Sequence, residues 1–119
     1  MSISNEIKNK EIEVLRDQSR VEKIRQYIAD HLATDLSAAT VAQTFGLSIS
    51  SLQHIFKRYQ QQTYQHYLEE TRMTKAFELI TQEDKRINEA MYATGYNNRV
   101  TFNIAFKKRF KHSPRHFKR

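Results

Sequence analysis

The chain contains only two glycines, and both occupy the same place in a repeated pattern. Each copy consists of a short helical segment, the glycine, a polar turn, a second helical segment and two cations. The first copy is VAQTFGLSISSLQHIFKR around Gly46, and the second is MYATGYNNRVTFNIAFKK around Gly95, with a turn one residue longer. Glycine most easily takes the left-handed conformation that a tight turn between helices requires. The repeat therefore predicts two helix-turn-helix units.

The second helix of each copy has one apolar and one polar face. Apolar side chains recur at spacings of three and four, as on one side of an α-helix. They are Leu52, Ile55 and Phe56 in the first copy and Phe102, Phe106 and Phe110 in the second. In the first copy Ala42 lies four residues before Gly46, where a small side chain lets two helices cross closely. The apolar faces predict the cores, and the polar faces are left outside.

No strand pattern appears, and a content of one proline and two glycines favours helices. We expect an all-α fold of about seven helices. Asp84 is a candidate cap for the fifth of them, and Pro114 suits the first turn of the last. The expected helices cover residues 20–33, 38–45, the segment after Gly46 to residue 60, 63–81, 86–94, 98–110 and 114–118.

These helices suggest four parts. Residues 1–19 form an N-terminal extension with loose helical spacing, and no proline or glycine separates it from the next helix, so one longer helix is an alternative. Two helix-turn-helix subdomains follow at residues 20–62 and 82–119. A linker helix at residues 63–81 joins them.

Positive charge is concentrated at the end of the chain. The net charge is +7, from 20 Lys and Arg against 13 Asp and Glu. Residues 99–119 hold eight cations and no acid, so the remainder, with 12 cations and 13 acids, is close to neutral. Concentrated positive charge indicates a polyanionic partner, with nucleic acid ahead of an anionic membrane.

Several functional classes have no support in the sequence. There is no cysteine, so disulfides and thiolate chemistry are excluded. We find no apolar run of about 20 residues, no secretory signal pattern, no glycine-rich phosphate loop and no paired-carboxylate site. His112 and His116 are four residues apart but lack a third ligand. We therefore expect a cytosolic protein that is not an enzyme and has no metal, cofactor or small-molecule site.

The segments LSAATVAQTFGLSISSLQHIFKRY and INEAMYATGYNNRVTFNIAFKKRFKHSPRHFKR resemble the DNA-binding domain of the AraC/XylS family of bacterial transcription regulators. The resemblance covers about residues 20–119. It implies two helix-turn-helix subdomains on a linker helix, binding adjacent major grooves of duplex DNA as one chain. The family usually has glycine where Gln61 and Lys111 stand, so these helix ends must close on another residue at some cost. Ala90 and Met91 exchange the volumes usual at these positions.

The outer faces supply candidate contacts with DNA. The family's base-reading positions fall on Ser50, Gln53 and His54 in the first unit. In the second, the residues left facing outward as base contacts are Arg99, Val100 and Asn103, beside Ile104, where relatives often carry a polar residue. Arginine suits guanine, asparagine suits adenine, and valine suits a thymine methyl. The cations expected to contact phosphates are Lys57, Arg58, Lys107, Lys108 and Arg109.

Two partner classes remain open. The first is duplex DNA, bound with sequence preference by a transcription regulator, with RNA polymerase as a second candidate partner. The alternative is a basic helical adaptor that binds RNA or an acidic protein. Relatives often carry a separate ligand-sensing and dimerising domain, whereas residues 1–19 are too short to hold a ligand pocket. The target sequence, the sign of regulation, the oligomeric state and whether the chain is a stand-alone regulator or a fragment stay open.

Overall fold

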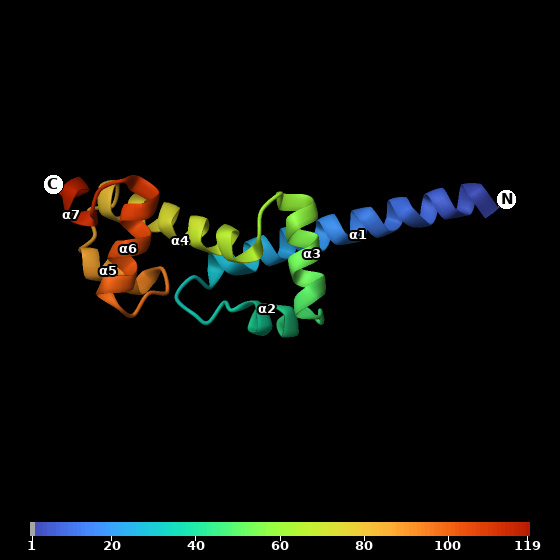
Figure 1. The fold of residues 1–119 in the computed structure, drawn as a ribbon, viewed down its shortest axis with the longest axis horizontal. Coiled ribbons are helices and arrows are strands. Elements are labelled where there is room, and N and C mark those ends of the chain that lie inside the picture. Colours follow the sequence, from blue (N-terminus) through green and yellow to red (C-terminus); the bar gives the residue numbers. More distant parts are fainter. Residues whose placement is uncertain (1) are drawn as a thin grey trace.

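Within residues 2–119, seven α-helices lie along an elongated molecule, with α4 linking its two halves (Figure 1). The computed structural model describes residues 2–119 and measures 65 × 22 × 21 Å. Within that range there is no strand, so the predicted all-α fold with two helix-turn-helix units and a linker helix is confirmed. The helices are α1 (Ser2–Asp30), α2 (Ala38–Thr44), α3 (Ile49–Gln60), α4 (Tyr64–Thr81), α5 (Ile87–Ala93), α6 (Arg99–Phe110) and α7 (Pro114–Phe117).

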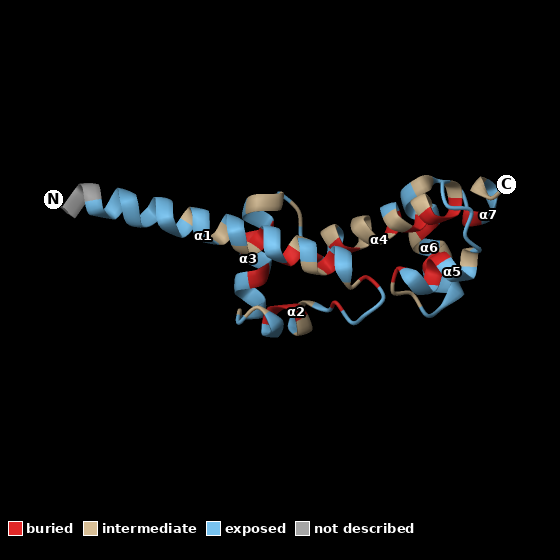
Figure 2. Cartoon of the chain, turned by 180° about the vertical axis from the view of Figure 1, so that it is seen from behind, coloured by how far each residue is buried: buried red, intermediate tan, exposed pale blue. Residues whose placement is uncertain are grey.

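The N-terminal extension and the first core helix are one continuous helix, α1, of 29 residues. Its second half is amphipathic and buries Val21, Ile24 and Ile28 in the first core. Its first half projects beyond the rest of the molecule, and residues 5–13 are all exposed (Figure 2). The longer-helix alternative is therefore the correct one. No helix within residues 2–119 has a stretch long and apolar enough to cross a bilayer.

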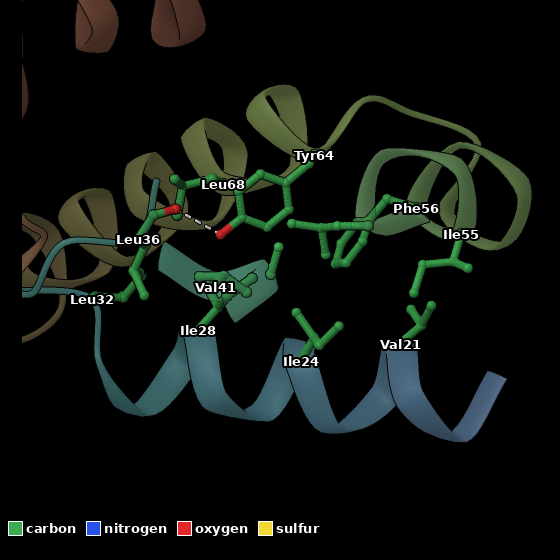
Figure 3. Close-up of a cluster of buried hydrophobic side chains, with 12 residues drawn as sticks. Val21, Ile24, Ile28, Leu32, Leu36, Val41, Ile55, Phe56, Tyr64 and Leu68 are labelled. Carbon is green, nitrogen blue, oxygen red and sulfur yellow. Dashed lines mark hydrogen bonds between the residues drawn. The ribbon is translucent and has the colours of Figure 1, made fainter. Parts of the chain in front are cut away.

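The first core lies between α1, α2, α3 and the start of α4 (Figure 3). Tyr64, the first residue of α4, is buried there with its ring edge-on to Phe56 at 5.2 Å between centroids. Its hydroxyl donates a 2.7 Å hydrogen bond to the carbonyl of Leu36, so the buried polar group is satisfied. Burial raises the pKa of Tyr64 to about 12. This side chain fixes the start of α4 against the first helix-turn-helix unit.

The second core lies between the rest of α4 and helices α5, α6 and α7. Phe102 and Phe106 are fully buried in it, as their spacing predicts, while Phe110 is half-buried and stacks on Phe77 of α4 at 4.6 Å. Ala90 and Met91 are both buried, so the exchanged volumes are accommodated. Because α4 supplies Tyr64 and Leu68 to one core and Met73 onward to the other, it is packed at both ends.

Most helices begin at a residue whose side chain can cap a helix. Side-chain caps from Ser37, Ser48, Thr63 and Asn98 begin α2, α3, α4 and α6. Gln61 and Lys111 close α3 and α6 with φ of 57° and 71°, the left-handed conformation expected to cost about 1 kcal/mol or more without glycine.

The expected cap of α5 is wrong. Arg86, and not Asp84, occupies the N-cap position of this helix. Asp84 itself has a φ of 51°. Its carboxylate instead accepts a 2.9 Å hydrogen bond from the ammonium of Lys118, which also bonds to the backbone carbonyls of Asp84 and Lys85. Lys118 thereby ties the C-terminal segment to the loop before α5.

Candidate nucleic-acid interface

The two glycine turns have the same hydrogen-bond geometry. Gly46 has a φ of +67° and Gly95 a φ of +91°. In each turn the residue after the glycine donates its N–H to a carbonyl five residues earlier, Leu47 to Ala42 at 2.8 Å and Tyr96 to Met91 at 3.0 Å. This is the bonding of a helix that ends on a left-handed residue. The extra residue of the second unit lies after this shared turn, before the cap of α6.

Because the turns match, α3 and α6 present equivalent positions. Leu52 and Phe102 are the first buried residues of the two helices, and Phe56 and Phe106 follow one turn later. At about 100° per residue, the side opposite these buried residues is a stripe of four positions on each helix. We call these the outward stripes: Ser50, Gln53, His54 and Lys57 on α3, and Val100, Asn103, Ile104 and Lys107 on α6.

The outward stripe of α3 contains every base contact predicted for the first unit. Ser50, Gln53 and His54 are exposed and lie on one side of the helix, with Lys57 one turn further on. The neighbouring serine, Ser51, is used differently, because its N–H and hydroxyl bond to the cap Ser48. The structure therefore brings the predicted residues together, and their contact with DNA stays a prediction.

The predicted base contacts of α6 are arranged differently. Val100 lies on the outward stripe with 67% of its side chain exposed. Arg99 lies beside the stripe, and its guanidinium donates a hydrogen bond to the side-chain oxygen of Asn88 in α5. Asn103 is half-buried, and its side-chain oxygen is buried without a hydrogen-bond partner among the described residues. Sequence reasoning places these residues on the right helix but does not show that two of them face partly toward protein.

The five predicted phosphate contacts are all exposed. One of them, Arg109, already has a partner, since its Nε donates a 2.8 Å hydrogen bond to the Glu70 carboxylate of α4. Its guanidinium also lies 4.9 Å from the centre of the Phe110 ring. The structure records no ion pair for Lys57, Arg58, Lys107 or Lys108 within residues 2–119.

A cluster that the sequence analysis missed connects the two units beside α4. Arg72 of α4 donates hydrogen bonds to the carbonyls of Leu32, at 3.4 Å, and Thr34, at 3.1 Å, both between α1 and α2. Its guanidinium lies 5.9 Å from the ring centre of Tyr96. A Cβ added to Gly95 would collide with the carbonyl of Leu32 and with the Arg72 guanidinium. We call these five residues the Arg72 cluster.

The described residues offer few features of other kinds of binding site. No group of three His, Cys, Asp or Glu side chains could hold a metal ion there. The rings of His112 and His116 stack on each other, with 4.0 Å between centroids and 13° between planes. An open groove of about 480 Å³ lies next to the Arg72 cluster, lined by polar side chains that include Asp35 and Asn97.

Two helix-turn-helix units on one linker helix, each with an outward stripe followed by exposed cations, define a double helix-turn-helix domain of the DNA-binding type. The helix-turn-helix domain family model matches residues 41–119. The chain belongs to the AraC/XylS family of transcription regulators, as its sequence motifs suggested.

Individual relatives agree with this assignment. The transcriptional activator RhaS of Enterobacter sp. (strain 638) is 30% identical over 99 residues, which are 83% of this chain and 36% of that protein. The C-terminal domain of AraT, a response regulator from Geobacillus stearothermophilus, is 32% identical with a TM-score of 0.78, and 83% of each chain is covered. This chain thus spans about a third of the length of the RhaS relatives.

One further structure shows the same fold. The DNA-binding domain of the global transcriptional factor AdpA, solved in complex with a target DNA, has a TM-score of 0.75 at 18% identity. The match covers 81% of this chain and 86% of that domain.

Proposed function

We propose that this chain is a sequence-specific regulator that places α3 and α6 in adjacent major grooves of duplex DNA. The observation that carries the proposal is the equivalence of the two outward stripes at opposite ends of one packed linker helix. In Figure 1 both helices lie across the long axis of the molecule and begin on the same side of it. The 18 residues of α4 span about 27 Å, comparable with the roughly 34 Å between successive turns of a groove.

The proposed contacts follow from side-chain chemistry. On α3, Gln53 has the paired donor and acceptor that match adenine, and Ser50 and His54 add shorter contacts. On α6, Arg99 gives up its hydrogen bond to Asn88 and donates to the two acceptors of guanine instead. The exchange costs little, because a solvent-exposed hydrogen bond contributes only about 1 kcal/mol. Val100 and Asn103 complete the base contacts of the second unit.

Phosphate contacts come from the exposed cations at the ends of α3 and α6. We assign this role to Lys57, Arg58, Lys107 and Lys108, which position the helices without specifying sequence. Arg109 contributes only when it leaves Glu70, and an exposed ion pair of this kind is worth no more than about 1 kcal/mol.

The described functions of two relatives support the proposal. RhaS is a transcriptional activator, and the AdpA domain was solved with its target DNA. The same likeness favours a binding protein over an enzyme, a cytoplasmic location, and RNA polymerase as a further partner. The proposed domain boundaries are residues 1–19 for the N-terminal extension, 20–62 and 82–119 for the two helix-turn-helix subdomains, and 63–81 for the linker helix. The competing function is a basic adaptor for RNA or an acidic protein.

Selection from a randomised duplex library tests the proposal. The expected result is a motif of two half-sites centred about one helical turn, roughly 10 base pairs, apart. For Lys108→Ala the slope of log affinity against log salt should become shallower by about 1, and affinity should fall equally on all sequences. Lys8→Ala, on the projecting half of α1, is the matched control and should leave the slope unchanged. If the wild-type protein selects no motif, the adaptor function replaces this one.

Arg99→Ala separates a base contact from a phosphate contact. It should cost about 1–3 kcal/mol on the selected site and relax preference at one or two adjacent positions of the second half-site only. Selection with the variant measures both effects. An unchanged motif with uniformly lower affinity would assign Arg99 to the phosphates.

A further inference from the structure

The outward stripe of α6 is apolar at its centre. Val100 and Ile104 are 67% and 64% exposed, and as residues four apart they are neighbours on the helix surface. The equivalent residues of α3 are Ser50 and His54, both polar. The two recognition helices therefore present different chemistry from the same scaffold positions.

The polar residues beside this pair are partly engaged elsewhere. Arg99 bonds to Asn88 of α5. Asn103, between Val100 and Ile104 in the sequence, is half-buried, with its side-chain oxygen turned away from solvent. The centre of the outward stripe in the first two turns of α6 is thus formed by two branched aliphatic side chains, with the hydrogen-bonding side chain of Arg99 beside them.

The pair has no role in packing. Val100 and Ile104 lie on the side of α6 opposite Phe102 and Phe106, which are fully buried in the second core. The cations Lys107 and Lys108 continue the same helix, so a polyanion is the partner that fits the surroundings.

Within a major groove, one apolar group distinguishes the base pairs. Thymine carries a C5 methyl group, whereas the other base edges present hydrogen-bond donors and acceptors. We propose that Val100 and Ile104 select thymines in the second half-site by packing against their C5 methyl groups. The second half-site is then read largely by apolar contact and the first largely by hydrogen bonds. This inference rests on the proposed function, because it requires α6 to enter the major groove.

Replacing thymine by deoxyuridine tests the contact directly, because it removes only the methyl group. Each dT of the selected duplex is replaced singly and the dissociation constant is measured. At contacted positions of the second half-site affinity should fall about 4-fold, the value of one buried methyl-sized group. Replacements in the half-site that α3 contacts should have little effect.

Protein variants complete a double-mutant cycle, in which the DNA methyl group and the protein side chains are removed separately and together. In Val100→Ala/Ile104→Ala the ratio of dT to dU affinities should fall to about 1, because the shorter alanine side chains leave the thymine methyl without an aliphatic partner on α6. Both residues are exposed, and alanine favours helix, so the fold should be kept. Ile12→Ala, an exposed residue on the projecting half of α1, is the matched control and should keep the wild-type ratio.

A methylated cytosine provides an independent measurement. Changing a contacted T·A pair to C·G should lower affinity, and 5-methyl-dC at that position should restore about 4-fold of the loss in the wild-type protein but not in the double variant.

The outcomes separate the two proposals. A wild-type protein that selects a two-part motif but is indifferent to dU in the second half-site overturns the thymine contact and leaves the regulator function standing. A second half-site without thymines does the same. A ratio that persists in the double variant assigns the methyl contact to other residues. If no motif is selected, the proposed function itself fails, and the apolar pair is then a surface for protein.

Discussion

Replacing Gly95 by alanine should disturb the junction between the two helix-turn-helix units. The backbone at this residue has a φ of +91°, which L side chains rarely adopt. The added Cβ would also collide with the backbone carbonyl of Leu32, which cannot move without shifting the end of α1, and with the Arg72 guanidinium, 2.8 Å from its Nη2. The substitution thus combines local strain with a collision between elements that belong to different units.

Gly46→Ala is the matched control, because it imposes the strain without the collision. Gly46 has a φ of +67° and nothing within 4 Å of an added Cβ. Left-handed alanine costs about 1–2 kcal/mol, of which about 0.4–1 kcal/mol is offset by the lower entropy of the unfolded chain. Gly95→Ala carries the same net cost plus overpacking of about 1–3 kcal/mol. It should therefore be the more destabilising variant by about 1–3 kcal/mol.

Urea denaturation of the wild-type protein and both variants measures the difference in the free energy of unfolding. For a domain of 119 residues, the extra loss corresponds to a Tm difference of roughly 3–12 °C. Selection from a library with variable half-site spacing gives a second measurement, in which Gly95→Ala should accept a broader range of spacings than Gly46→Ala. Equal losses of stability for the two variants would show that the Arg72 cluster does not hold the units together.

Two further predictions concern the packing and charge of single residues. Ala42→Leu should overpack the crossing of α2 and α3 and lower the free energy of unfolding by about 1–3 kcal/mol, whereas Ala39→Leu, on the exposed side of α2, should have little effect. The hydrogen bond from Lys118 lowers the pKa of Asp84 below its ordinary 3.8. A lowered carboxylate pKa stabilises the fold above the ordinary value, and this contribution is lost as pH falls through the folded pKa. The Tm advantage of wild type over Lys118→Met should accordingly become smaller in acid, while the part that comes from the bonds of Lys118 to the carbonyls of Asp84 and Lys85 is kept.

Much of the fold follows from local sequence signals. The two glycines, the serine and threonine caps and the apolar spacing each act over a few residues, so the positions of α2 to α4 and α6 can be predicted closely. The helix ends at Gln61 and Lys111 were expected from the resemblance to the AraC/XylS family, which usually has glycine at these two positions, and both residues are left-handed. The continuous α1 stayed ambiguous, since residues 5–13 make no contact that a hydrophobic pattern would reveal.

The site was harder to predict because its decisive contacts join residues far apart in the chain. Arg109 pairs with Glu70, Lys118 with Asp84, and Arg72 bonds to Leu32 and Thr34, at separations of 34 residues or more. A charged side chain on a helix has many potential partners, and spacing alone does not select one. For Arg72 a weak signal existed, namely a cation between the buried Leu68 and Met73 on a helix that serves two cores.

In both repeats, the buried residues that hold the second helix in place are different from the outward residues that this helix exposes. Leu52 and Phe102, and again Phe56 and Phe106, occupy equivalent buried positions, so each unit orients its second helix by the same means. Apart from the half-buried Asn103, the residues of the outward stripes are exposed and therefore free to differ, as the exposed Val100 of α6 does from the serine at the same position of α3. Because α4 packs into both cores, a change of readout in one unit need not alter the placement of the other. If the two stripes read DNA as proposed, the asymmetry of a site with two unlike half-sites at a fixed spacing is already matched by the difference between the stripes of one chain.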